Sequence, residues 1–63
     1  MKDLLHKGVK TVQNTMKRRG YIVACDYEDG NNYVVEFAKT AAGITVKSVT
    51  VVFNSNWRVI EVK

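Results

Sequence analysis

The spacing of the apolar residues changes at Gly20, and this change divides the chain into a helical first third and a β-rich remainder. At about 100° per residue, the apolar residues before Gly20 fall on one narrow stripe: Met1, Leu5, Val9, Val12 and Met16. Leu4 lies on its flank. The pattern predicts an amphipathic helix from about Lys2 to Arg19, with Gly20 as its C-cap glycine.

Beyond Gly20 the apolar residues alternate with a period of two, which indicates β-strands. Turn-forming residues separate four such runs, at 21–27, 33–39, 44–53 and 57–63. The Asp29-Gly30 pair predicts a hairpin after the first run, and 40–43 and 54–56 are expected to be loops. Connections this short require antiparallel pairing of consecutive strands.

The longest run changes phase partway along its length. Ile44 and Val46 share one parity, whereas Val49, Val51 and Phe53 share the other. This predicts either a bulge near residues 47–48 that switches the faces, or a strand that is apolar on both sides.

The expected fold is of the α+β class, a single small domain over residues 1–63. An N-terminal amphipathic helix packs on a four-stranded antiparallel β-meander, in the order α-β-β-β-β. The chain is 46% hydrophobic and 25% charged, which is ordinary for a folded protein. A chain of 63 residues buries only roughly 60% of its unfolded surface, so its stability is expected to be marginal.

Signatures of catalysis are absent from the sequence. It has no GxSxG, HExxH, glycine-rich phosphate loop or paired cysteines. Cys25 is the single cysteine and His6 the single histidine, so neither an intramolecular disulfide nor a Cys/His zinc site can form. We expect Cys25 to be buried and inert, His6 to be solvated, and the protein to have no catalytic residues, metal, cofactor or small-molecule substrate.

One set of residues invites comparison with magnesium-dependent nucleases. Asp26, Glu36 and Lys39 offer two carboxylates and a lysine from neighbouring strands, as such enzymes require. Glu36 and Lys39 are three residues apart, however, so they point to opposite faces of a regular strand. Asp26 and Glu36 are more simply explained as solvent-facing residues on one face of the sheet.

The chain has a net charge of +4, and its positive charge is concentrated in its first third. Five cations of the predicted helix are candidates for phosphate contacts with a nucleic acid: Lys7, Lys10, Lys17, Arg18 and Arg19. A solvated helix face explains them more simply, and the last three suit the negative end of the helix dipole. The helix stripe lacks the Trp and Phe of interfacial helices, and no apolar run is long enough to cross a bilayer, so no membrane contact is expected.

Two local sequences are similar to known families. The segment 21–27, followed by Asp-Gly and by Tyr33-Val-Val-Glu-Phe37, is similar to PepSY-type domains, which implies a helix-plus-meander module that binds or inhibits proteins. The segment 17–21, Lys-Arg-Arg-Gly-Tyr, resembles the helix-to-strand junction of HicA-type RNA-cleaving toxins. Those toxins carry a histidine in an early strand and end with a helix, and this chain has neither. The sequence is assigned to neither family.

The apolar residues of the strands exceed what one helix can cover, which predicts a second, partner-binding sheet face. We therefore expect a small non-enzymatic binding or regulatory protein of the cytoplasm that binds a protein partner or itself. This profile is common among accessory proteins of phages and mobile elements. Trp and Arg are enriched at interface hot spots, so they complete the expected contact set: Ile22, Val34, Val52, Trp57, Arg58, Ile60 and Val62. The alternative is a nucleic-acid-binding protein that uses the basic helix.

Overall fold

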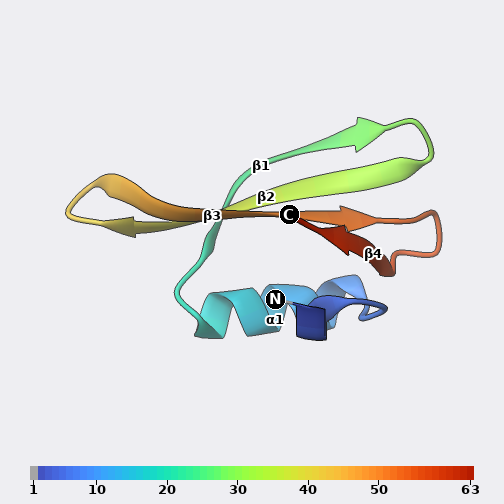
Figure 1. The fold of residues 1–63 in the computed structure, drawn as a ribbon, viewed down its shortest axis with the longest axis horizontal. Helices are drawn as coiled ribbons and strands as arrows, with labels where there is room; N and C mark the ends of the chain where they lie inside the picture. The colour runs from blue at the N-terminus through green and yellow to red at the C-terminus, as the bar shows by residue number, and fades with distance from the viewer. Residues whose placement is uncertain (1) are drawn as a thin grey trace.

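The computed structural model describes residues 2–63, so Met1 of the predicted stripe lies outside the described residues. It begins with a 3-10 turn, η1 (Lys2–Leu4), and a helix, α1 (Val9–Arg18). Four strands follow: β1 (Ile22–Asp29), β2 (Asn32–Ala41), β3 (Ile44–Phe53) and β4 (Val59–Val62). The strands form one antiparallel sheet in the order β1-β2-β3-β4 (Figure 1). The α+β class and the antiparallel meander are therefore confirmed.

The predicted start of the helix is wrong, because the chain leaves helical geometry between Leu4 and Val9. His6 adopts a positive φ of 66°, and Gly8 is extended at φ −81° and ψ 166°. The amide of His6 donates to the carbonyl of Val59 (2.9 Å), and the amide of Val59 donates to the carbonyl of Lys7 (3.0 Å). Residues 6–8 thus pair with the start of β4, and a helix cannot make these bonds at the same time.

The predicted end of the helix is confirmed, and its geometry explains why Gly20 is needed there. The amide of Gly20 donates to the carbonyl of Lys17 (3.1 Å), and the amide of Tyr21 donates to that of Met16 (2.9 Å). These two bonds are those of a Schellman motif, in which the residue after the C-cap has a left-handed conformation. Gly20 fills that position with φ 86°.

Two of the predicted connections differ in the structure. The expected loop over 40–43 is a two-residue turn, because β2 continues to Ala41 and β3 begins at Ile44. Its two residues, Ala42 and Gly43, have φ of 53° and 78°, as in a type I′ hairpin turn. The last strand was expected from Trp57, but Trp57 has φ 62° and belongs to the turn before β4.

Each of three strands contains a bulge that changes which face its residues occupy. The register leaves Ala24 in β1, Val46 in β3 and Ile60 in β4 as extra residues opposite a regular neighbour. The bulge in β3 lies one residue before the predicted position and resolves the change of phase there. The bulge in β4 brings Val59 and Val62 to the same face although they are three residues apart.

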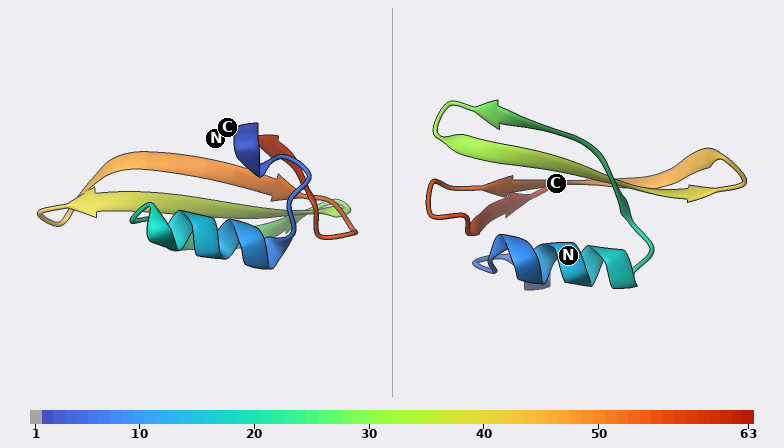
Figure 2. Two further views of the ribbon diagram at one scale, coloured as in Figure 1. Left: turned by 90° about the horizontal axis from the view of Figure 1, so that it is seen from below. Right: turned by 180° about the vertical axis from the view of Figure 1, so that it is seen from behind.

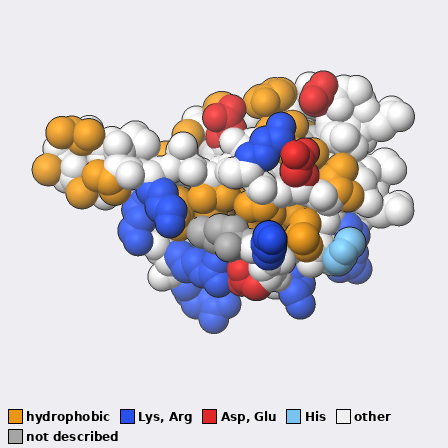
Figure 3. Space-filling model, viewed as in Figure 1, with side chains coloured by type: hydrophobic (Ala, Val, Ile, Leu, Met, Phe, Trp, Pro, Cys, Tyr) orange, Lys and Arg blue, Asp and Glu red, His pale blue; other side chains and the backbone are white. Residues whose placement is uncertain are grey.

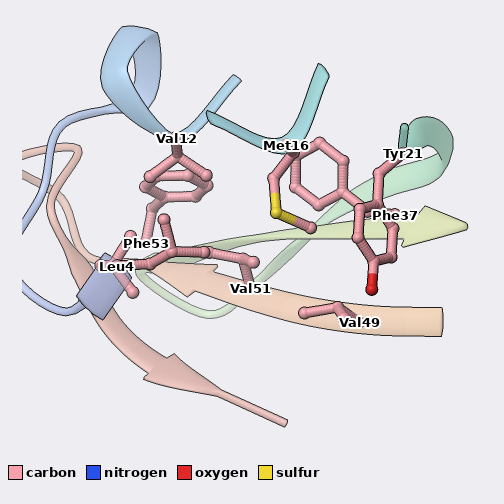
Figure 4. Packing of buried hydrophobic residues seen from close by; sticks show 9 residues of the cluster. Leu4, Val12, Met16, Tyr21, Phe37, Val49, Val51 and Phe53 are labelled. Carbon is pink, nitrogen blue, oxygen red and sulfur yellow. The ribbon is translucent and has the colours of Figure 1, made fainter. Parts of the chain in front are cut away.

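The hydrophobic core joins residues from α1, η1 and one face of the sheet (Figure 4). Its buried members are Leu4, Val12, Met16, Tyr21, Phe37, Val49, Val51, Phe53 and Val59. Figure 4 shows Val12 above Phe53 and Met16 beside Phe37. Figure 2 shows α1 on one side of the sheet, with the β2–β3 hairpin extending past the end of the helix.

Leu4 and Leu5 exchange the roles that the helical stripe predicts for them. Leu4 is 1% exposed and belongs to the core, whereas Leu5 is only partly buried. The reason is the break before α1, which turns η1 back toward the sheet. Arg19 at the end of α1 holds the carboxylate of Asp3 at 2.7 Å and ties this segment to the helix.

Leu4→Ala tests the position of this segment. Removing a fully buried leucine costs about 2–5 kcal/mol of folding free energy, because it loses apolar burial and leaves a cavity. Leu5→Ala, the matched control, is expected to cost clearly less. Urea denaturation followed by circular dichroism measures both, and equal losses would mean that the helix starts at Lys2 after all.

Gly20→Ala tests the helix end. A side chain with a Cβ costs about 1–2 kcal/mol in the left-handed conformation, and the new Cβ would also lie 3.4 Å from Cε of Lys39. Gly20→Asn is expected to cost less than Gly20→Ala, because asparagine tolerates this conformation better. Thermal unfolding of both variants gives the comparison, and an unchanged midpoint for Gly20→Ala would contradict the Schellman geometry.

Candidate interaction surfaces

The predicted contact set does not form one surface in the structure. Ile22 and Ile60 are 59% and 44% exposed but lie in strands at opposite edges of the sheet. Trp57 and Arg58 are exposed in the turn before β4. Val62 packs against the core on the helix side, because the bulge at Ile60 reverses its direction.

The second face of the sheet is less apolar than the strand pattern indicates. The register aligns one row of side chains across all four strands: Tyr27, Val34, Val52 and Glu61. The two central valines are only 3% and 7% exposed, since larger side chains flank these small ones. The adjoining rows contain Glu36, Thr50 and Ser48, so this face offers little open apolar area.

The two edges of the sheet differ in whether another segment covers them. At the β4 edge, residues 6–8 bond to Val59 and form a bridge between Gly8 and Arg58. At the other edge, β1 pairs with β2 only, and all eight of its residues are exposed. β1 is therefore the long free edge of the sheet, with an outer row of backbone groups open to a partner.

An apolar groove lies next to the start of β1. It is lined by Gln13, Lys17, Tyr21, Ile22, Val23 and Phe37, and its volume is about 330 Å³. The groove exists because α1 covers only part of this face, so Val23, the cross-strand partner of the buried Phe37, stays 52% exposed. The apolar pattern of the sequence does not reveal this groove, because the bulge at Ala24 decides which β1 residues share a face with Phe37.

Two side-chain pairs link β1 to β2. The Tyr33 hydroxyl donates to the carboxylate of Asp26, and this bond raises the pKa of Tyr33. The Cys25 thiol donates to Oε2 of Glu36 at 3.3 Å, and this bond to a carboxylate raises the pKa of Cys25. The expectation that Cys25 is buried is wrong, since the bulge at Ala24 puts it on the exposed second face. Its raised pKa still disfavours the reactive thiolate.

The nuclease arrangement does not form. Asp26 pairs with Val35, and Glu36 pairs with Cys25, so the two carboxylates lie on opposite faces of the sheet. The expectation that they share a face is wrong, because beyond the bulge at Ala24 the register pairs even-numbered residues of β1 with odd-numbered residues of β2. Within residues 2–63, no three His, Cys, Asp or Glu side chains gather closely enough to hold a metal ion.

The five predicted cations are all exposed, but they do not form a single helical stripe. Lys7 lies before α1, in the segment that pairs with β4. Arg19 bonds to Asp3, and this bond lowers the pKa of Asp3. Only Lys10, Lys17 and Arg18 belong to α1 itself.

Two further lysines of the strands join the basic end of α1, and sequence analysis missed them as partners of the helix. The ammonium of Lys39 lies 5.7 Å from the ring centre of Tyr21, and Lys39 faces Lys47 directly across the β2–β3 ladder. Lys39 is two residues from Phe37, and Lys47 is two residues from Val49, so the even spacing within each strand was a signal that both lysines share the helix side.

Comparison with known proteins adds no relative: no protein-family model, curated protein or solved structure matches the chain. The part of the chain that the structure describes has no helix of the length and apolar character that a membrane crossing needs.

The contact of Cys25 with Glu36 predicts a slow thiol. Because its pKa is raised, the thiolate fraction at neutral pH is small, and alkylation by iodoacetamide should accelerate at a higher pH than for an ordinary thiol, whose pKa is about 8.5. Glu36→Gln removes the charge and should speed alkylation severalfold at neutral pH. Glu28→Gln, an equal change of charge on the same hairpin, should leave the rate unchanged, and equal acceleration in both variants would refute the contact.

Proposed function

We propose that this chain is a non-enzymatic binding module that holds an extended segment of a partner protein along the free edge of β1. The observation that carries the proposal is that all eight residues of this edge strand are exposed beside an apolar groove. Proteins usually shield an edge of this length, as residues 6–8 do for β4.

The mode of binding would be the addition of a strand to the sheet. In this mode, main-chain hydrogen bonds supply affinity and side-chain pockets supply selectivity. The groove provides such a pocket, because Ile22 and Val23 border it and Phe37 lies within its lining. An apolar side chain of the added segment that enters this groove would cover the exposed surface of Val23.

The charge of β1 and β2 favours a basic segment. Four of the six acids in the chain lie between residues 26 and 36, and no Lys or Arg occurs from residue 20 to residue 38. Two of these carboxylates are engaged by Tyr33 and Cys25, and the other two are Glu28 and Asp29. An apolar anchor near Val23, followed by Lys or Arg along the rest of β1, would match this surface.

A cytoplasmic location is part of the proposal. Cys25 is exposed and unpaired, and such a thiol is stable in a reducing compartment. The module as proposed has no catalytic role.

Selection of a random peptide library against the protein tests the proposal without knowledge of the natural partner. The enriched peptides should combine a β-branched or aromatic residue with Lys or Arg, and amide hydrogen exchange should show new protection in 22–29. Val23→Lys should weaken binding by about tenfold or more, because it places a charge at the groove.

Ile44→Lys is the matched control. Ile44 is 67% exposed and Val23 is 52% exposed, so both changes put a lysine on an open strand position. The control should bind as the unchanged protein does. The proposal fails if no peptide is enriched, if both variants bind equally, or if the protected amides lie outside β1.

A further inference from the structure

The end of the β2–β3 hairpin projects from the sheet, apart from the edge of β1 that is proposed to bind a partner. Residues 39–48, called the ribbon below, extend beyond both neighbouring strands, since β1 pairs only as far as Ala38 and the β4 side only as far as Thr50. All ten residues of the ribbon are exposed. Figure 1 shows it as the two-stranded projection at the left.

The base of the ribbon lies against the end of α1. Cε of Lys39 is 3.4 Å from the position that a Cβ on Gly20 would occupy, and its ammonium lies over the ring of Tyr21. Lys17 lines the groove that also contains Tyr21. The tertiary structure thus brings Lys17 and Arg18 of the helix to the same end of the molecule as the two lysines of the ribbon.

This end carries positive charge with little to balance it. No Asp or Glu occurs from residue 4 to residue 25, or from residue 37 to residue 60. Among the described residues, neither Lys39 nor Lys47 has an ion-pair partner. Figure 3 shows Lys and Arg side chains gathered below the projecting ribbon, whereas most Asp and Glu side chains lie on the upper side.

The direct pairing of Lys39 with Lys47 works against folding. Like charges opposite each other in an antiparallel ladder are unfavourable. The ring of Tyr21 stabilises the ammonium of Lys39, but within residues 2–63 Lys47 has no ion pair or ring contact that offsets this repulsion. A polyanion bound at this end would remove the repulsion, because it would neutralise both lysines.

We propose that the ribbon and the adjoining end of α1 bind double-stranded DNA, with the ribbon in the major groove and Lys17, Arg18, Lys39 and Lys47 on the phosphates. The major groove of B-form DNA admits a two-stranded β-ribbon. The ribbon suits this groove because both of its edges are free and it contains no acidic side chain. The deep, narrow major groove of A-form RNA excludes such a ribbon.

Fluorescence anisotropy with a labelled random-sequence DNA duplex tests this inference over a salt series. Binding should weaken steeply as salt rises from about 50 to about 200 mM, because phosphate contacts release counterions. Lys47→Glu should lower the affinity about tenfold. It should also reduce the slope of log affinity against log salt concentration by more than the share of one phosphate contact. The new carboxylate faces Lys39, so this variant should fold at least as stably as the unchanged protein.

Lys7→Glu is the matched control. It makes the same change of charge at an exposed lysine in the segment that pairs with β4, away from the ribbon. It should retain most of the affinity for DNA. Equal losses in both variants would assign the binding to overall charge and overturn the proposed site, as would the absence of any binding at low salt.

Three parallel samples separate DNA from other polyanions. An RNA duplex of the same sequence, vesicles with anionic lipids and polyglutamate should each bind more weakly than the DNA duplex at equal salt. Tighter binding to any of them would overturn the proposal. So would sedimentation showing that the ribbon binds the acidic hairpin of a second copy and that DNA does not compete. The peptide-binding readout at β1 is independent, since Lys47→Glu should leave it unchanged.

Discussion

The structure depends on how little of the sheet one short helix can cover. α1 has ten residues and is therefore about 15 Å long, whereas the molecule extends 36 Å along its longest axis. Val12 and Met16 are fully buried and share one core with side chains of β2, β3 and β4. Beyond this contact lie β1 and the ribbon, and α1 covers neither of them.

The same constraint makes the supporting contacts of the N-terminal segment important. With so small a core, Leu4 adds a fully buried side chain, and the bonds of residues 6–8 to Val59 cover the start of the β4 edge. One segment therefore extends the core and shields an edge that would otherwise be open to aggregation. Among the described residues no segment covers the outer edge of β1 in this way, so that edge is open to a partner.

The order of charges along the chain becomes a spatial separation through the meander. Successive turns of an antiparallel meander lie at opposite ends of the sheet, so the acidic β1–β2 turn and the lysines of the ribbon are held apart. The two proposed activities use different strands but meet at Lys17, which lines the groove beside β1 and also belongs to the proposed DNA site.

The sequence by itself determined the class and order of the elements, because the change of apolar period at Gly20 and the turn-forming residues are local signals. It also determined the end of α1, where only glycine fits the left-handed position easily. Only the tertiary structure decided the start of α1, since this depends on hydrogen bonds between residues 6–8 and Val59. The bulges at Ala24, Val46 and Ile60 decided which strand residues share a face, and therefore why Cys25 is exposed and Val62 lies on the helix side. Both candidate surfaces arise from segments distant in the sequence, and local patterns carry no information about such pairings.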